Sequence, residues 1–153
     1  MTKLKQIRLG DLAVIISGYA FKSEIFTDAG VPVIKIANIK NGATLFEEGK
    51  TAYLPAVLAQ AVKERFWVRR GDILISLTGS HLTHPNSVVG RVAQYKESFP
   101  SLLNQRAGKV WIKDKDELSN DYLYYFLLTD SVRQEIALLA HGAANQANRP
   151  YTE

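Results

Sequence analysis

The spacing of apolar residues changes once along this chain, near Asp121, and this change constrains the fold more than any other feature. Before that point, short β-branched runs alternate with turn residues, which is typical of strands. The predicted strands cover residues 31–39, 73–77, 88–94 and 107–112. After it, apolar residues recur at intervals of three and four, which predicts helix. The helical stripe comprises Tyr122, Tyr125, Phe126, Thr129, Val132, Ile136, Leu139 and Ala140. Strands followed by helices predict an α+β fold with a mixed β-sheet, short helices and a C-terminal helical pair.

Cap and turn residues predict the smaller elements. A short helix is expected over Leu9–Val14, and a brief strand over Val14–Ser17. A further helix is expected over Pro55–Lys63, because proline suits the first turn of a helix. Asp130 is a candidate N-cap that divides the C-terminal stripe into two helices, and Gly142 is a candidate C-cap.

Composition limits the class of protein. The 153 residues are 46% hydrophobic, enough for one core, and no repeat or linker divides them. We therefore expect a single domain over residues 1–148, followed by a tail at 149–153. No apolar run approaches the roughly 20 residues of a membrane helix, and Met1–Arg8 lacks the features of a secretory signal. Cysteine is absent, which excludes disulfides and thiolate metal sites. These features predict a cytoplasmic protein with no membrane partner.

The charge leans toward anionic partners. The formal net charge is +4 and the pI is about 9.3. Basic residues gather at the start of the chain, and again over residues 63–70, whereas acids gather over residues 114–121. A positive balance attracts nucleic acids, although it does not by itself establish binding.

The stretch "GDILISLTGSHLTHPNSVVGRVA", Gly71 to Ala93, carries two apolar strands to a polar tip at Thr78–Ser87. Three interpretations compete: a metal site, a plain surface hairpin, and a surface that binds a polar molecule. His81 and His84 lie in a predicted loop, and no carboxylate lies between Ile73 and Gln94. A zinc site requires three or four ligands, so two solvated histidines are the better interpretation and we expect no metal.

Motifs for catalysis or nucleotide binding are weak. The segment "LTGSH" places a serine beside a histidine, but it lacks the G-x-S-x-G turn of hydrolases. The sequence has neither a G-x-x-x-x-G-K loop nor a G-x-G-x-x-G loop, so no cofactor is expected. The "NRPY" segment at Asn148–Tyr151 is a faint match to the N-P-P-Y motif of adenine methyltransferases and is interpreted as a tail. "RGD" at Arg70–Asp72 is interpreted as a turn before a strand.

Four polar clusters adjoin the predicted strands, and their residue types are those that bind nucleic acids. Asn and Gln match the donor and acceptor of adenine, and Arg matches guanine. Lys, Arg, Ser and Thr hold phosphates. The clusters comprise Tyr19, Phe21 and Lys22; Lys35, Asn38 and Lys40; Thr78, Ser80 and His81; and Asn104, Gln105 and Arg106. Any one cluster is as readily the ordinary polar end of a strand, so the residues alone indicate a candidate binder and no more.

Several segments, taken in order, resemble those of one known family. They are "LGDLAVIISGYAFKS", "GVPVIKIANIKNG", "GDILISLTGSHLTHPNSVVGRVA", "LLNQRAGKV", "YLYYFLLTDSVRQEI" and "HGAANQAN", which span about Leu9 to Asn148. Together they resemble the target recognition domain of the specificity subunit in type I restriction-modification enzymes. The resemblance implies a fold similar to the recognition domain of certain adenine methyltransferases. It also implies that the domain reads one half of a bipartite double-stranded DNA target and carries no catalytic residues.

The resemblance also gives the polar clusters expected roles. Asn104, Gln105 and Arg106 are expected to contact bases. Phosphate contacts are expected from Lys22, Lys35 and Lys40, with Tyr19, Phe21 and Asn38 nearby. The tip at Thr78–Ser87, which includes Ser80 and His81, is expected to face DNA. The alternatives are that Phe21 is a core residue and that Arg106 pairs with an acid.

One departure from the family concerns its protein partners. In the family, long helices follow the recognition domain and dock the methyltransferase and restriction subunits, whereas this sequence ends at Glu153. A fragment, an engineered single domain and a natural truncation all fit this departure. An alternative function is a protein–protein interaction or inhibitory module without its own DNA specificity. A small enzyme is a third class.

Overall fold

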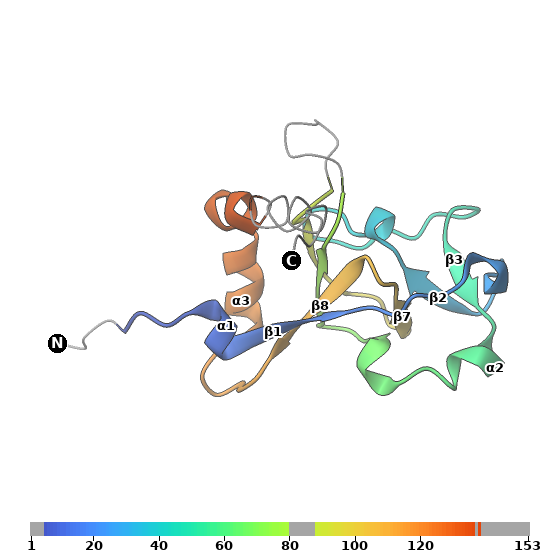
Figure 1. Cartoon of the computed structure of the whole chain (residues 1–153), viewed down its shortest axis with the longest axis horizontal. Coiled ribbons are helices and arrows are strands. Elements are labelled where there is room, and N and C mark those ends of the chain that lie inside the picture. The colour runs from blue at the N-terminus through green and yellow to red at the C-terminus, as the bar shows by residue number, and fades with distance from the viewer. Residues whose placement is uncertain (1–4, 80–87, 137, 139–153) are drawn as a thin grey trace, which may run out of the picture.

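A computed structural model describes residues 5–79, 88–136 and 138, and its strands form two four-stranded sheets (Figure 1). In the antiparallel sheet, the order is β1 (Ala13–Ser17), β8 (Ala107–Ile112), β5 (Ile73–Ser76) and β6 (Val92–Gln94). In the mixed sheet, the order is β3 (Ala52–Leu54), β2 (Val31–Ile34), β7 (Ser101–Leu103) and β4 (Trp67–Val68). The β2 and β7 strands run parallel, and the other neighbours in this sheet run antiparallel.

Short helices connect or cover the strands. The α-helices are α1 (Leu9–Leu12), α2 (Ala56–Ala59) and α3 (Asn120–Leu127), and the 3₁₀ turns are η1 (Ser23–Ile25), η2 (Ile36–Asn38) and η3 (Glu64–Phe66). Residues 130–136 are helical again, which confirms a helical pair near the C-terminal end of the described residues. The α3 helix begins where the Ser119 hydroxyl accepts a hydrogen bond from the Tyr122 backbone N–H at 3.3 Å.

The apolar β5 strand is buried on both faces because it lies between two core clusters. Ile73 and Ile75 point to one side, where they join a cluster that includes Leu123 and Leu127 of α3. Leu74 points to the other side, where it joins residues of the mixed sheet such as Leu103. Burial on both faces explains why Ile73–Ile75 are all apolar and do not alternate with polar residues.

A third core cluster covers the outer face of the mixed sheet. It contains Val33 and Leu102, whose strand neighbours face the inner cluster, together with Leu54 and Ala59. Partly buried aromatic residues, including Phe21, pack against it. The expectation that Phe21 is a core residue is therefore confirmed in part, and the loop after β1 is fixed to the mixed sheet through that ring.

Lys109 joins the two sheets. It lies on β8, and its side chain is only 7% exposed. Its Nζ donates a hydrogen bond to the Trp67 backbone oxygen of β4 at 2.6 Å and lies 3.6 Å from Asp72 Oδ2. The Asp72 carboxylate also accepts a hydrogen bond from the Arg69 backbone N–H at 2.9 Å, which confirms that "RGD" forms a turn.

The predicted elements differ from the observed ones mainly at their ends. The strand predicted over 107–112 is observed with those bounds, and the one predicted over 73–77 ends one residue earlier. The strand predicted over 31–39 is wrong beyond Ile34, because the chain turns into η2 to cross between the sheets. The helix expected over Pro55–Lys63 ends at Ala59, and β6 begins only at Val92. The short strands β3, β4 and β7 were not predicted.

Tyr95 makes the stability of this fold sensitive to alkaline pH. Burial raises the pKa of its hydroxyl to about 12 from the ordinary 10.0, while a hydrogen bond with Ser101 opposes the rise and Glu97 adds to it. Because the folded-state pKa is the higher one, this contribution to stability is fully present below about pH 10. It is lost as the pH rises toward 12. We expect wild-type protein to lose more stability than Tyr95→Phe between pH 8 and pH 11, measured by urea unfolding.

Two features of that experiment make it specific. Tyr95→Phe will itself be less stable at pH 8, because the hydroxyl donates to the Phe99 backbone oxygen at 2.9 Å and lies 2.5 Å from Ser101 Oγ. The relevant quantity is therefore the change with pH within each variant. Tyr122→Phe, at a position that is 64% exposed, is the matched control and should keep the wild-type pH dependence. Parallel pH profiles for wild type and Tyr95→Phe would contradict the prediction.

Candidate nucleic-acid interface

The turn at residues 104–106 connects β7 to β8 and therefore passes from one sheet to the other. Three segments fix its backbone. The Asn104 N–H donates to the Ile34 oxygen, the Gln105 N–H to the Tyr19 oxygen, and the Leu77 N–H to the Arg106 oxygen, each at 3.0 Å. The side chains of Gln105 and Arg106 are exposed, and that of Asn104 is half-buried. A rigid main chain thus carries an amide and a guanidinium group into solvent.

Close approach at Gly18 brings the first polar cluster to this turn. The Gly18 N–H donates to the Ala107 oxygen at 3.0 Å, and the Tyr19 N–H donates to the Leu103 oxygen at 2.8 Å. A Cβ atom at Gly18 would lie 2.3 Å from the backbone oxygens of both Leu103 and Asn104. Only glycine permits this approach, which places Tyr19 beside residues 104–106.

The third cluster is described only in part. Thr78 is exposed and follows Leu77, whose backbone is bonded to Arg106, so Thr78 lies beside the 104–106 turn. Ser80, His81 and His84 lie outside the described residues. Within the described part of the chain, no group of three or more histidine, aspartate or glutamate side chains is placed to hold a metal ion.

The predicted lysines occupy three different places. Lys22 is exposed at the start of η1, next to Phe21 in the chain. Lys35 follows Ile34, and its Nζ lies 4.3 Å above the centre of the Phe26 ring. Lys40 is half-buried in a turn that binds β6 through the Gly42 N–H and the Val92 oxygen at 2.8 Å. Lys40 is therefore not brought together with the 104–106 turn by any contact among the described residues.

Asn38 requires a correction. It was expected near the DNA contacts, but it is only 8% exposed. Its Oδ1 accepts a hydrogen bond from the Lys35 N–H at 2.9 Å, and its Nδ2 donates to the Leu45 oxygen at 3.0 Å. Both ends of the amide are used within the fold, so Asn38 holds the η2 turn together and does not present an amide to DNA.

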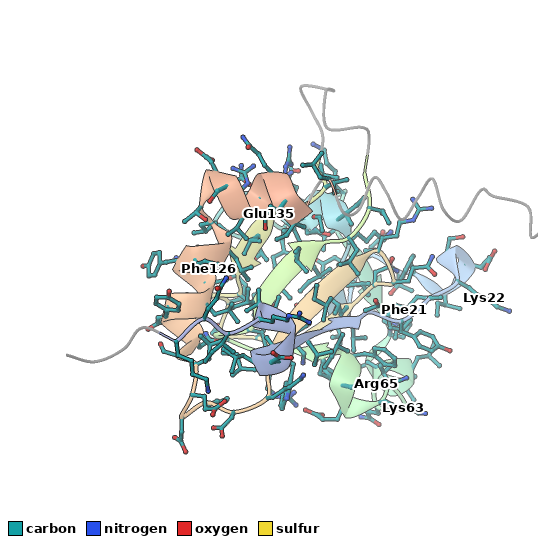
Figure 2. The ribbon with its side chains drawn as sticks, turned by 60° about the vertical axis from the view of Figure 1, so that its left-hand side comes forward. Phe21, Lys22, Lys63, Arg65, Phe126 and Glu135 are labelled. Atoms are coloured by element: carbon teal, nitrogen blue, oxygen red, sulfur yellow. The ribbon has the colours of Figure 1, made fainter. Side chains whose placement is uncertain are left out.

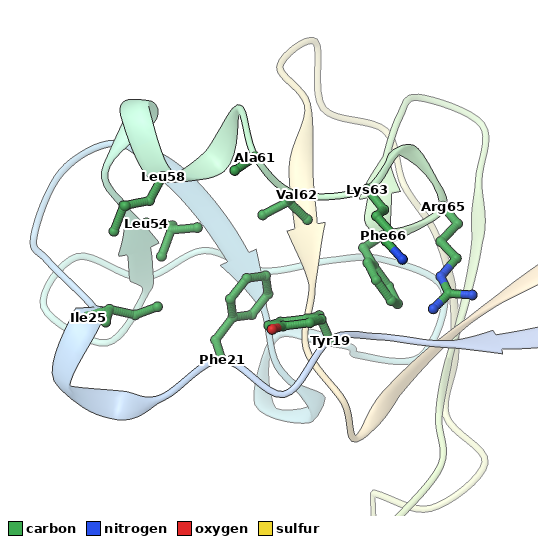
Figure 3. A pocket seen from close by; sticks show the side chains of 10 residues that line it. All are labelled: Tyr19, Phe21, Ile25, Leu54, Leu58, Ala61, Val62, Lys63, Arg65 and Phe66. Atoms are coloured by element: carbon green, nitrogen blue, oxygen red, sulfur yellow. The ribbon is translucent and has the colours of Figure 1, made fainter.

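A pocket of about 470 Å³ adjoins the 104–106 turn and was not predicted (Figure 3). Its ring-bearing residues form a row. The Phe21 and Tyr19 ring centres are 4.9 Å apart, and those of Tyr19 and Phe66 are 5.5 Å apart. The Arg65 guanidinium lies 4.6 Å from the Phe66 ring centre and continues the row. Aliphatic side chains, among them Leu54 and Leu58, form the opposite part of the lining.

Two basic side chains lie at one end of this pocket. Lys63 and Arg65 line it and are exposed, and Figure 2 shows them on the same side of the molecule as Phe21 and Lys22. Glu64 lies between the two in the chain, but it is bonded to Arg69. The excess of basic residues over 63–70 was the sequence signal for this region, although it did not identify the aromatic partners.

Arg106 forms no ion pair with an acid within the described part of the chain, so the alternative role considered for it is not supported there. Across the same residues, no helix is both long enough and apolar enough to cross a membrane.

Comparisons with known proteins identify relatives that cover most of the chain. The chain is 31% identical over 120 residues to the type I restriction enzyme EcoAI specificity subunit of Escherichia coli, covering 78% of this chain and 19% of that subunit. It is 25% identical over 145 residues to the MjaVIII specificity subunit of Methanocaldococcus jannaschii, covering 95% of this chain and 32% of that subunit. The chain thus spans between about a fifth and a third of these relatives.

Fold comparison agrees with the sequence comparison. The crystal structure of the HsdS subunit from Thermoanaerobacter tengcongensis matches 86% of this chain and 28% of its own, with a TM-score of 0.58 and 19% identity. That likeness confirms the α+β fold. A family model described as the type I restriction modification DNA specificity domain matches residues 1–148. The chain therefore belongs to the type I restriction-modification DNA specificity domain family.

Proposed function

We propose that this domain reads one half of a bipartite double-stranded DNA target within a type I restriction-modification specificity subunit. The domain supplies recognition and no chemical step, and it acts in the cytoplasm. Because the chain spans 19% and 32% of its curated relatives, the docking of methyltransferase and restriction subunits is assigned to the rest of such a subunit. Family membership supports DNA as the ligand.

The 104–106 turn is the observation that carries this proposal. Gln105 and Arg106 are exposed, and they offer the donors and acceptors that match adenine and guanine in the major groove. The backbone of the 104–106 turn is already fixed by three hydrogen bonds to other segments, so little conformational freedom of the backbone is lost when DNA binds. Asn104 is half-buried and its backbone N–H is bonded to β2. We therefore assign it mainly to anchoring the turn, and the DNA contacts mainly to Gln105 and Arg106.

Phosphate contacts are assigned to cations around this turn. Lys35 directly follows the residue that bonds Asn104, and Lys22 extends the loop that carries Tyr19. Lys40 lies by β6 and would contact the backbone farther along the duplex. Thr78 remains a proposed contact beside the turn, and Ser80 and His81, which lie outside the described residues, remain proposed contacts as well. These residues position the duplex, whereas Gln105 and Arg106 select its sequence.

Arg106→Ala should relax sequence preference. We expect the substitution to weaken binding to the preferred duplex by about 1–3 kcal/mol and to remove selectivity at one or two positions, because a bidentate contact with guanine is lost. The preferred duplex is first obtained by selection from a random library at two salt concentrations. Affinity is then measured by fluorescence anisotropy on that duplex and on each single-base variant.

Two further variants distinguish sequence-specific contacts from sequence-independent contacts with phosphates. Lys22→Ala should weaken binding to every duplex alike and reduce the salt dependence, because a phosphate contact is sequence-independent. Lys115→Ala removes the same charge from the exposed segment beyond the far end of β8 and should leave both the affinity and its salt dependence unchanged. If no duplex is enriched and binding at high protein concentration shows no salt dependence, the domain is instead a protein–protein module.

A further inference from the structure

We propose that the aromatic pocket formed by Tyr19, Phe21, Phe66, Lys63 and Arg65 binds an unstacked base of the bound DNA. This inference rests on the proposed function, because that function brings DNA to the domain. Its evidence is separate, because it comes from the lining of the pocket and not from the side chains of the 104–106 turn.

The first argument is that the Tyr19 ring is both exposed and rigidly held. Its side chain is 50% exposed, yet it is held between two other rings at 4.9 Å and 5.5 Å. Its backbone is also fixed, through the Leu103 oxygen and the Gln105 N–H. A ring that served only the core would be buried. A rigid and exposed ring offers a π-face on which a base stacks without ordering the side chain first.

Charge is the second argument, and it decides which ligand fits. Among the residues that the structure describes, Lys63 and Arg65 are the charged members of the lining, and no acid lines the pocket. The acid nearest to them in the chain, Glu64, is bonded to Arg69. An apolar peptide side chain would gain nothing from two cations, whereas a nucleotide brings a phosphate with every base. The stacked Arg65 guanidinium can contact that phosphate while it covers the Phe66 ring.

Position is the third argument. Tyr19 belongs both to the pocket and to the hydrogen-bonded contact with Gln105. DNA held by the 104–106 turn therefore lies against the mouth of the pocket. A base that leaves the stack there moves into a cavity of about 470 Å³, ample for one purine or pyrimidine. The energetic cost of unstacking is offset by the new stacking and by the phosphate contact.

A minimal probe tests the pocket without any target sequence. It is a labelled trinucleotide whose central position carries adenine and whose flanking positions are abasic, compared with a fully abasic trinucleotide. We expect the full chain to bind the adenine-containing probe about tenfold more tightly, the effect of stacking one base on an aromatic side chain. Tyr19→Leu should abolish this difference, and Tyr19→Trp should preserve it. Tyr122→Leu, at an exposed tyrosine on α3, should behave as wild type.

A second measurement uses the duplex obtained by selection. A mismatch that weakens the pairing of the unstacked base should tighten binding, because less energy is spent on opening the pair. Mismatches are introduced one position at a time, and one position should give a gain of about tenfold in wild type. The same mismatch should give no gain in Tyr19→Leu. Circular dichroism of each variant confirms that the fold is kept.

The outcomes separate this inference from the proposed function. Equal affinity of the wild-type chain for the two trinucleotides overturns the inference. So does a neutral tryptophan-containing peptide that binds the pocket while adenine adds nothing, because the pocket then docks protein. If a preferred duplex is selected but no mismatch tightens binding, the domain still recognises DNA and the pocket takes no part in that recognition. Base-dependent trinucleotide binding without duplex selection supports the pocket and contradicts duplex recognition.

Discussion

Replacement of Gly18 by alanine is expected to destabilise the domain by about 3 kcal/mol and to abolish its DNA binding. The added Cβ would lie 2.3 Å from two backbone oxygens, those of Leu103 and Asn104. Backbone atoms cannot rotate out of the way as a side chain can, so the end of β1 must move from the β7–β8 connection. That movement breaks the hydrogen bonds of Gly18 with Ala107 and of Tyr19 with Leu103 and Gln105. Urea unfolding and anisotropy measure the two effects.

Gly10→Ala is the matched control for this prediction. No heavy atom outside its chain neighbours and its own helix lies within 4 Å of a Cβ placed at Gly10, which is in α1, at the opposite end of β1 from Gly18. The control should change stability by no more than about 0.5 kcal/mol, as is usual for open surface positions. A Gly18→Ala protein with wild-type stability would show that the contact between the Tyr19 loop and the 104–106 turn is loose. The proposed rigid reading turn would then be wrong.

The second large effect is expected at Lys109. Lys109→Met keeps most of the side-chain volume but removes the ammonium group, and we expect a loss of about 3 kcal/mol. The Trp67 oxygen loses the hydrogen bond measured at 2.6 Å, and the Asp72 carboxylate loses its cation at 3.6 Å. The cost therefore comes from the lost hydrogen bond to the Trp67 oxygen and the lost cation beside Asp72, which keeps its bond from the Arg69 N–H, and not from a cavity.

The control for this prediction is a variant in which an exposed lysine is replaced by methionine. Lys115→Met provides it, since Lys115 is exposed beyond the end of β8. Its unfolding midpoint in urea should stay within experimental error of wild type, while that of Lys109→Met should fall with an unchanged slope. A double-mutant cycle with Asp72→Asn measures how much of the loss belongs to the ion pair. An unaltered midpoint for Lys109→Met would show that the sheets are held together by apolar contacts alone.

Short, mainly apolar runs allowed part of this fold to be predicted from sequence. The β8 strand was predicted with its observed bounds and β5 to within one residue, because each is mainly apolar and is bounded by turn residues. The short strands β3, β4 and β7 have two or three residues each, too few to show a period. Their pairing is set by the tertiary structure, in which the parallel contact of β2 with β7 joins distant segments. That contact divides the strands between two sheets where one was expected.

The candidate site was predictable where it lies in one segment and not where several segments meet. Asn104, Gln105 and Arg106 form one turn, as their order in the sequence suggested. The contact of that turn with Tyr19 depends on Gly18, whose role becomes visible only when the Leu103 and Asn104 oxygens are placed beside it. Asn38 was expected near the DNA contacts because sequence does not reveal the Leu45 oxygen that its amide binds.

The way in which residues 104–106 are anchored bears on how such a domain acquires a new target. All three anchoring contacts, to Ile34, Tyr19 and Leu77, are made by main-chain atoms that every amino acid other than proline possesses. The outward groups at positions 105 and 106 can therefore be exchanged freely while the scaffold keeps its shape. If positions 105 and 106 read bases, as proposed above, single codon changes alter which bases are preferred without passing through misfolded intermediates.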